Sequence, residues 1–460
     1  MSGLFGTLSI ALSSLGVSQD EMATTSNNVA NANTPGYSRE VSDVAAGDPI
    51  EQGSLSVGTG VILQKIESLR DPILEIQLNQ STQQNSQLNT TLAQLQTLQT
   101  QFASSTSGLG ADISDFFNSL EQLAPDPTNL ELRQSVLTAA GNLATDFNTA
   151  SNSLQTQRSN IDLNVTQSVG QVNALTSQIA SINQQIGNLT NAGQNPGTLV
   201  DTQTNLIRQL SSLVGVSVIP TDEGISVALS NGTTLVSGSQ SFALTTQLGT
   251  DGVQHIYSDS QDITGALTGG SLAGLIQVRD QEIPGVGSDL DQLAAGLASG
   301  LNTANQAGFD LNGNAGTNLF VPPPVGGVGA AGALAVNITD PSRLAASSDG
   351  TSGSNGNLAV LSSVATQPLA NGETPINSYS SIVFQVGNDT SNVSADADAS
   401  GLILQQLQDQ RGSVSGVSLD EEASNLIQYQ TAYQAAARVV SSVNALLADA
   451  VNLGLGAAVQ

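Results

Sequence analysis

The chain has 460 residues, enough for roughly two to four domains with a sizeable core. Its 38 acidic residues outnumber its 10 basic residues, and the formal net charge of -28 argues against a nucleic-acid ligand, because phosphate binding needs a basic surface. Cysteine is absent, which excludes disulfides and thiol nucleophiles. Only 10% of the residues are charged, so the surface could pack against copies of itself with little charge to desolvate, although an ordinary acidic protein fits this composition equally well.

No segment predicts a membrane span or a cleaved secretory signal. A secretory signal needs basic residues ahead of its apolar stretch, and the first basic residue here is Arg39. The longest apolar run, residues 325–336, is rich in Gly and Ala and too short to cross a bilayer. We therefore expect no membrane insertion, and a protein that is either cytosolic or exported by a route that reads no cleavable signal.

A heptad repeat predicts a helix at the start of the chain. Leu4, Leu8, Leu15 and Met22 fall at helical spacing on one face, with smaller residues between them. The repeat stops at the sequence N-T-P-G-Y of residues 33–37, because proline disfavours helical geometry in the residue before it and Pro-Gly forms turns.

The last segment predicts a longer helix, from about residue 419 to residue 453. Residues 418–421, S-L-D-E, match a capping box at its start. Leu419, Leu426, Tyr433 and Leu447 then lie on one apolar seam of a helix roughly 50 Å long. Because such a seam cannot bury itself, we expect the two terminal helices to pack together, antiparallel or near-parallel, with the rest of the chain inserted between them.

Further patterns predict a helical bundle and a small β domain in the middle of the chain. Amphipathic runs indicate helices at about residues 71–102, 158–189, 199–214 and 288–307. The sequence Asn231-Gly232 lies between two alternating apolar runs and is a hairpin signal, so the β domain is expected at 216–282.

The predicted fold class is mainly α-helical with inserted β structure. The expected domains are a terminal helical domain (1–70 plus 405–460), a helical bundle rod domain (71–215 plus 283–404) and the inserted β domain (216–282). The stretch 321–400 within the bundle domain is loop-rich, and we expect irregular β structure and poor order there.

Three motifs that resemble ligand sites have simpler explanations. Residues 327–332, G-V-G-A-A-G, match a dinucleotide-binding pattern, but they follow prolines instead of a strand, which favours a flexible loop. Asp310, Asn312 and Asn314 resemble a calcium loop whose later ligands are missing, which favours an Asx-rich turn. His255 has no obvious catalytic partner and is expected to be structural. We therefore expect no cofactor, no metal and no enzymatic activity.

Four asparagines gather at the end of the first predicted helix: Asn27, Asn28, Asn31 and Asn33. Asparagine is costly there, because its amide competes with the helix backbone. Two interpretations remain open on the residues alone. The helix end could simply fray into the following turn, or the amides could form a face that makes hydrogen bonds to neighbouring copies in an assembly.

Both ends of the chain resemble one known family. Residues 27–37 are similar to the signature N-N-x-A-N-x-x-T-P-G-Y of the bacterial flagellar axial proteins, which include rod, hook and hook-associated subunits. Residues 415–439 resemble the paired signature at the other end of that family. Three internal stretches, at 199–210, 269–280 and 290–316, are similar to the hook-associated members.

The resemblance implies an extracellular structural subunit of the flagellum. Such a subunit leaves the cytoplasm through the type III export channel without signal cleavage and forms a ring of copies at the junction between hook and filament. Its implied partners are the hook protein, a second hook-associated junction protein and an export chaperone that holds the C-terminal helix. Two alternatives stay open: another axial subunit of the hook or filament, and a secreted surface adhesin that uses residues 216–400.

The expected mechanism is coupled folding and assembly, in which terminal helices that are disordered in the monomer form an inner tube with neighbouring copies. The expected N-terminal interface residues are Leu4, Leu8, Leu15, Met22, Asn27, Asn28, Ala30, Asn31, Asn33, Thr34, Pro35, Gly36 and Tyr37. The expected C-terminal residues, which would also contact the chaperone, are Leu419, Leu426, Tyr429, Gln430, Tyr433, Gln434, Ala437, Arg438, Val440, Leu447 and Val451.

Overall fold

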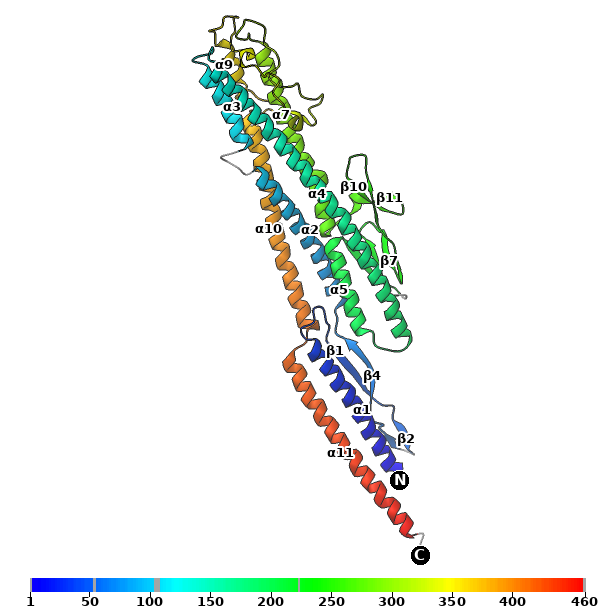
Figure 1. Ribbon diagram of the computed structural model, residues 1–460. Helices are drawn as coiled ribbons and strands as arrows, with labels where there is room; N and C mark the ends of the chain where they lie inside the picture. The colour runs from blue at the N-terminus through cyan, green and yellow to red at the C-terminus, as the bar shows by residue number, and fades with distance from the viewer. Residues whose placement is uncertain (1, 53–54, 103–107, 222–223, 458–460) are drawn as a thin grey trace.

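The structure is a computed structural model that describes residues 2–52, 55–102, 108–221 and 224–457. It is a long rod of helices with small β-sheets inserted, which confirms the predicted fold class (Figure 1). The terminal helices lie at one end of the rod, irregular loops lie at the other end, and a β domain lies beside the middle (Figure 1).

The two terminal helices pack side by side, as the heptad repeats predict. Helix α1 (Ser2–Asn31) and helix α11 (Leu419–Ala457) run antiparallel, so that both ends of the chain lie together at the tip of the rod (Figure 1). Four strands between α1 and the bundle complete what we call the terminal unit, which comprises α1, α11 and these strands. The strands are β1 (Glu40–Ala46), β2 (Ile50–Gln52), β3 (Leu55–Val57) and β4 (Val61–Ser68).

The strands of the terminal unit form a ribbon that the sequence analysis did not anticipate. Strands β1 and β4 pair antiparallel from Glu40 opposite Ser68, with a shift in register after Asp43, and they lie against α1. Strands β2 and β3 extend this ribbon towards the start of α1. Alternation of apolar and polar residues is weak here, which is why the pattern did not predict strands.

Long helices form the bundle that makes up most of the rod. They are α2 (Pro72–Phe102), α3 (Leu109–Leu123), α4 (Leu130–Asn191), α5 (Gly197–Leu213), α6 (Gly270–Gln277), η2 (Val278–Glu282), α7 (Ile283–Gln306) and α10 (Pro375–Ser415). Side-chain caps begin three of them, because Asp71 accepts from the N–H groups of Ile73 and Leu74, Asn129 caps α4 and Thr374 caps α10. The predicted run at 158–189 lies inside the 62-residue helix α4.

One continuous apolar core runs through the bundle and the β domain. It includes the aromatic rings of Phe116, Phe147 and Phe320, all of which are fully buried. Residues of α2, α3, α4, α5, α7 and α10 contribute to this core, whereas no described residue of α1 or α11 does. The terminal unit is therefore packed separately from the core that stabilises the rest of the chain.

Two small sheets lie beside α4 where the inserted β domain is expected, whereas residues 270–282 of that stretch are helical and pack in the bundle (Figure 1). The first contains β5 (Val216–Thr221), β6 (Gly224–Leu229), β7 (Thr234–Ser237) and β8 (Gln240–Ser241). The second contains β9 (Thr245–Leu248), β10 (Gln254–Ser258) and β11 (Gln261–Asp262), with η1 (Thr264–Ala266) after it. The Asn231-Gly232 turn joins β6 to β7, and Gly232 adopts the positive φ of 87° that such turns require.

A buried arginine ties the β domain to the bundle. Arg279 lies in η2 with no exposed side-chain surface. Its guanidinium contacts Asp162 of α4 at 2.8 Å and Asp280 at 2.7 Å, and it donates to the carbonyl of Gln254 in β10. A buried charge is stable only when it is paired in this way, so Arg279 fixes where the inserted domain sits.

The expectation of irregular β structure across 321–400 is wrong, because these residues form no strand and take part only in isolated bridges at Val336 and Ser347. Up to residue 374 the chain is irregular but packed, with α8 (Ala330–Ala333), η3 (Pro341–Arg343) and α9 (Gly356–Ser363). Helix α10 then begins at Pro375, where Thr374 caps it, and runs for 41 residues along α2. The residues that α10 buries are large and apolar near its start, at Ile382 and Val386, and small further along, at Ala397 and Ser400. The apolar periodicity therefore weakens along the sequence although the helix continues.

An acidic pair between α3 and α4 gives a pH-dependent prediction. Burial, a hydrogen bond to Asp146 and repulsion from that carboxylate raise the pKa of Asp112 to about 6. A raised carboxyl pKa means that the folded state holds the proton more tightly, so stability from this group is lost as the pH rises from about 4 through 6. Asp112→Asn is therefore expected to raise the free energy of unfolding at pH 7 by about 1 kcal/mol, since the group is partly exposed.

Urea denaturation at pH 4 and pH 7 measures this effect. The matched control is Glu121→Gln, which removes the same charge from an exposed position on the same helix; Asp115 is unsuitable because its charge also helps to raise the pKa of Asp112. Asp112→Asn should increase the free energy of unfolding at pH 7 and change it little at pH 4. An equal increase from both variants at pH 7 would show that the overall charge, and not the acidic pair, is responsible.

Candidate assembly site

The Thr-Pro-Gly-Tyr sequence forms a tight turn that joins α1 to β1. The N–H of Tyr37 donates to the carbonyl of Thr34 at 3.1 Å, and Gly36 has a φ of 81°, as the third position of a type II turn requires. The turn sits on α5, where Asn205 donates to the carbonyl of Pro35, and a Cβ at Gly36 would overlap the Asn205 side chain. The motif therefore seats the terminal unit on the bundle.

Asn28 is the centre of a buried hydrogen-bond network behind this turn. Its amide oxygen accepts from the Tyr37 hydroxyl and from the N–H of Glu40, both at 2.9 Å. Its amide nitrogen donates to the carbonyl of Glu40 at 2.8 Å and to the carboxylate of Glu422 at 3.1 Å. Burial and three nearby carboxylates raise the pKa of Tyr37, so its hydroxyl remains a donor. All of the hydrogen-bonding capacity of Asn28 is thus used within the chain.

Arg39 links the two terminal helices to the end of the bundle. Its guanidinium contacts the fully buried carboxylate of Glu422 at 2.7 Å and that of Glu421 at 3.0 Å. Its backbone N–H donates to the carbonyl of Ser415, the last residue of α10. The start of α11, the turn after α1 and the end of α10 are therefore held by one residue.

Three more arginines complete the network on the bundle side. The carboxylate of Glu75 accepts from Arg411 at 2.6 Å and from Arg208 at 3.0 Å, and Asp201 accepts from Arg70 at 2.9 Å. We call the whole network the clasp; its members are Asn28, Tyr37, Ser38, Arg39, Glu40, Arg70, Glu75, Asp201, Arg208, Arg411 and Glu422. It uses four of the ten basic residues of the chain. The sequence analysis did not identify its charged members, although isolated arginines in so acidic a chain are a usable signal.

The row of α11 that faces α1 is not the row that the apolar seam predicts. Glu422, Tyr429, Ala436 and Val443 repeat every seven residues and are buried or half-buried against α1. The predicted seam residues Leu419, Leu426, Tyr433 and Val451 are 53%, 38%, 36% and 58% exposed, and Gln430, Gln434 and Arg438 are exposed as well. Ala437, Val440 and Leu447 lie half-buried at the border. We call Leu419, Leu426, Tyr433 and Val451 the outer face of α11.

Some of the predicted interface residues of α1 are packed within the chain, and others are exposed to solvent. Leu4, Leu8, Leu15 and Met22 are half-buried, whereas Phe5 and Leu12 are exposed. In the asparagine-rich motif, Asn28, Gly36 and Tyr37 are engaged inside the chain, and Asn31 is half-buried. The residues left exposed for contacts with other molecules are Asn27, Ala30, Asn33, Thr34 and Pro35.

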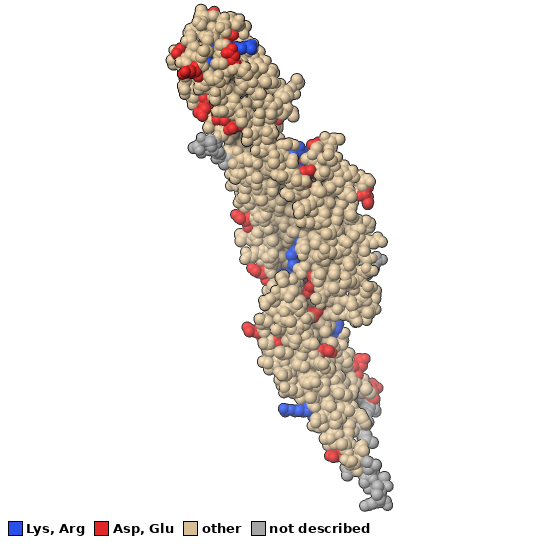
Figure 2. All heavy atoms as spheres, in the orientation of Figure 1, with Lys and Arg blue, Asp and Glu red and all other residues tan. Residues whose placement is uncertain are grey.

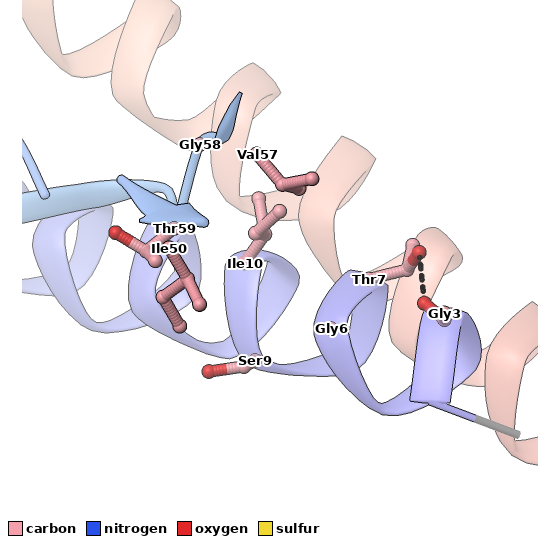
Figure 3. A pocket seen from close by; sticks show the side chains of 9 residues that line it. All are labelled: Gly3, Gly6, Thr7, Ser9, Ile10, Ile50, Val57, Gly58 and Thr59. Carbon is pink, nitrogen blue, oxygen red and sulfur yellow. Dashed lines mark hydrogen bonds between the residues drawn. The ribbon is translucent and has the colours of Figure 1, made fainter. Parts of the chain in front are cut away.

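A groove lies where the start of α1 meets the β2–β3 hairpin (Figure 3). It has a volume of about 260 Å3. The side chains of Ile10, Ile50 and Val57 line it together with the backbone of Gly3 and Gly6, and none of the three apolar side chains is buried. On the visible face few charged groups lie over α11, whereas several acidic groups lie over the strands of the terminal unit (Figure 2).

The three motifs with ligand-like patterns are engaged within the chain. The N–H groups of Gly329 and Ala331, inside the 327–332 pattern, donate to the carboxylate of Asp291. The expectation of a flexible loop there is wrong, because Ala330–Ala333 form α8 with Ala330 and Ala331 buried. The carboxylate of Asp310 accepts from the N–H groups of Asn312 and Asn314, which confirms the Asx-rich turn. Within the described residues, no helix is long and apolar enough to cross a membrane.

His255 is held between two carboxylates in the β domain. Its Nδ1 lies 2.6 Å from Asp262 and its Nε2 lies 3.2 Å from Asp251. The hydrogen bond with Asp262 outweighs burial, which opposes the charge, and raises the pKa of the imidazole. This arrangement pins β10 to its neighbours and agrees with the structural role expected for His255.

Comparisons with known proteins match the whole chain to one set of relatives. A family model described as the helical domain of flagellar hook-associated protein FlgK matches residues 92–320. The models for the flagella basal body rod protein and for the C-terminal part of flagellar basal body rod proteins match residues 8–37 and 410–453. These last two matches define a flagellar axial protein, with the matched segments on α1 and α11.

Curated relatives and a solved structure narrow this class. Flagellar hook-associated protein 1 of Bacillus subtilis is 30% identical over 99% of this chain and 100% of its own length. The protein of the same name from Escherichia coli is 27% identical over 96% and 98% of the two chains. The flagellar hook junction protein FlgK of Burkholderia pseudomallei shares the fold, with a TM-score of 0.67 at 19% identity over 74% of this chain and 100% of that chain. The chain belongs to the flagellar hook-associated protein 1 family.

The buried half of the clasp should stabilise the chain far more than a surface ion pair does. Glu75→Ala leaves two partly buried arginines without their carboxylate, and the expected loss is about 3 kcal/mol of unfolding free energy. The matched control is Glu67→Ala, which breaks the exposed pair with Lys65 and should cost much less, because solvent screens that pair. Urea denaturation of the full chain compares them, and equal losses would contradict a structural role for the clasp.

Proposed function

We propose that this chain is a structural, non-enzymatic subunit at the junction between hook and filament, and that it joins the flagellum by coupled folding of its terminal unit. Membership of the hook-associated protein 1 family supports the junction over a role as hook or filament subunit. We further propose that the chain is extracellular after type III export. Its partners are then copies of itself in a ring, the hook protein and a second hook-associated junction protein.

The observation that carries this proposal is the poor burial of the terminal helices. The apolar residues that they bury fully are small or β-branched: Ala11, Val17, Ala436 and Val443. Their larger side chains, such as Phe5 and Leu426, remain exposed. At about 25 cal/mol per Å2 of buried apolar area, such a pair gains little against the entropy of ordering two long helices. Neighbouring copies would supply the missing contacts.

The proposed division of labour follows the three expected domains. The terminal domain (1–70 plus 405–460) would form the inner tube, and in the monomer its helices α1 and α11 would be disordered beyond the clasp. The bundle domain (71–215 plus 283–404), together with α6 and η2 from the 216–282 stretch, would form the outer wall, and the sheets of the β domain would face solvent. The clasp supports this proposal, because it lies where the first domain meets the second and fixes the direction in which the terminal unit leaves the bundle.

The outer face of α11 has two proposed uses in succession. Before export it would be held by a chaperone, because Leu419, Leu426 and Tyr433 are exposed and apolar on a helix that is not yet folded against a neighbour. After export the same face would pack against other subunits. A surface that serves both partners explains how the chain stays soluble in the cell and assembles only outside it.

Amide hydrogen exchange tests the coupled folding. In the isolated chain at low concentration, the amides of α1 and α11 should exchange within seconds, because the terminal helices open often, whereas those of α4 should be protected. In purified hooks that carry the chain, α1 and α11 should become protected too. Strong protection of both terminal helices in the dilute monomer would contradict the mechanism and would leave the junction role without its physical basis.

A single charge on the outer face should block assembly. Leu426→Asp places a carboxylate where a neighbouring subunit would pack, and desolvating it is costly. In a strain that lacks the wild-type chain, we expect about tenfold fewer filaments per hook with this variant. The matched control is Leu163→Asp, an exposed leucine on α4, which should support normal filament numbers. Electron microscopy counts both, and normal counts for Leu426→Asp would sink the proposal.

A further inference from the structure

Arg438 is an isolated positive charge on an otherwise uncharged helix surface. It is the only charged residue between Ala423 and Ala448, and it is exposed. Within the described part of the chain it has no ion-pair partner, unlike Arg39, Arg70, Arg208, Arg279 and Arg411. An arginine in the middle of an assembly surface must be paired when that surface is buried, because an unpaired charge there is costly.

The exposed acid that could meet it lies on α1. Helix α1 has no charged residue from Ser2 to Gln19, and its first acids are Asp20 and Glu21. Burial raises the pKa of Glu21, which lies beside Tyr429 at the α1–α11 contact, whereas Asp20 is exposed and has no ion-pair partner in the described chain. Asp20 on α1 and Arg438 on α11 are therefore exposed charges of opposite sign with no ion-pair partner among the described residues; α11 also carries the exposed acids Asp420 and Asp449 near its two ends.

The two charges cannot pair within one chain. Asn28 contacts Glu422, and since the helices are antiparallel, Arg438 then lies level with Leu12. Asp20 is eight residues further along α1, which is about 12 Å at 1.5 Å per residue. Arg438 also lies on the side of α11 away from α1, since it does not fall on the repeat of Glu422, Tyr429 and Ala436.

The exposed apolar residues have the same spacing as the charges. Leu12 precedes Asp20 by eight residues on α1, and Leu446 follows Arg438 by eight residues on α11. Leu12 is 51% exposed and Leu446 is 54% exposed. In an antiparallel contact, one alignment places Arg438 against Asp20 and Leu446 against Leu12 at the same time. Copies that point the same way in a ring present α11 of one beside α1 of the next in this antiparallel sense.

We infer that α11 of each subunit packs on α1 of the next copy of this chain, with Arg438 paired to Asp20 and Leu446 packed on Leu12. This inference rests on the proposed function and specifies its lateral contact. The apolar pair contributes adhesion, and the ion pair sets the register, because any other alignment leaves a charge against apolar or amide groups. Adjacent copies are then offset by about 12 Å along the helices relative to the contact within one chain.

Charge exchange tests the ion pair in a strain that lacks the wild-type chain. R438D and D20R should each lower the number of filaments per hook by about tenfold, because each places like charges together. The double variant R438D/D20R should restore it. The matched control is R438D/D449R, which has the same net charge but places the new arginine on α11 itself, and it should not restore filaments.

Three outcomes overturn the inference. In the first, R438D gives normal numbers of filaments while Leu426→Asp gives few. This result would refute the Arg438–Asp20 contact and leave the proposed function standing. The R438D/D20R variant could fail to restore filaments, which would assign Arg438 to the hook protein or another neighbour. R438D could reduce the amount of chain exported to the medium, which would assign Arg438 to the chaperone.

Disulfide trapping tests the apolar pair independently, because the chain contains no cysteine of its own. L12C/L446C should give a ladder of linked subunits in oxidised, purified flagella. A bond within one chain is excluded, since the two positions are about 12 Å apart along the helices and a disulfide needs Cα atoms within about 7 Å. The control L12C/I427C, also at exposed positions, should give no ladder. Assembled flagella without a ladder for L12C/L446C would overturn the proposed register.

Discussion

The terminal helices carry an apolar sector that is wider than one partner helix can cover, and the rest of the architecture depends on this mismatch. Helix α1 covers the middle of the sector on α11, at Ala436 and Val443, where the side chains are small. Larger side chains remain on both flanks, with Leu426 and Tyr433 on one and Leu446 on the other. The α1–α11 pair has its backbone hydrogen bonds satisfied, but many of its large apolar side chains are not covered. Such a pair is suited to pack against further amphipathic helices.

The clasp fixes the orientation of the terminal helices relative to the bundle, which apolar contacts alone do not. Apolar packing is non-directional, whereas charge-assisted hydrogen bonds fix both distance and angle. Arg39, Asn28 and Glu422 join the two terminal helices at the point where the chain leaves the bundle, and Arg411 joins the same turn to α10. A rod that has to present its terminal helices at one angle in every copy needs such a joint, and the chain concentrates its few basic residues there.

The sequence is sufficient to predict α1, α2, α5, α7, α11 and the second half of α4, the meeting of the terminal helices at one end and the Asn231-Gly232 hairpin, because local spacing decides these features. It predicts the wrong row of α11 as the inner face, because heptad analysis selects the largest apolar residues, whereas the close α1 contact selects Ala436 and Val443. Helix α10 is missed because small residues such as Ser400 replace the apolar period. The clasp is missed because it unites residues as far apart as Asn28 and Glu422, 394 positions away, and no local pattern records such a contact.

The position of the charges reconciles the net charge of -28 with assembly. Copies that each carry this charge repel one another, yet repulsion between exposed groups is screened beyond about 8 Å at physiological ionic strength. The faces expected to meet are nearly free of charge: α1 has none before Asp20, and α11 has only Arg438 between Ala423 and Ala448. Most acids lie elsewhere, where they keep the monomer soluble and add little to the free energy of contact. The same chain can therefore be strongly acidic as a whole and adhesive at one end.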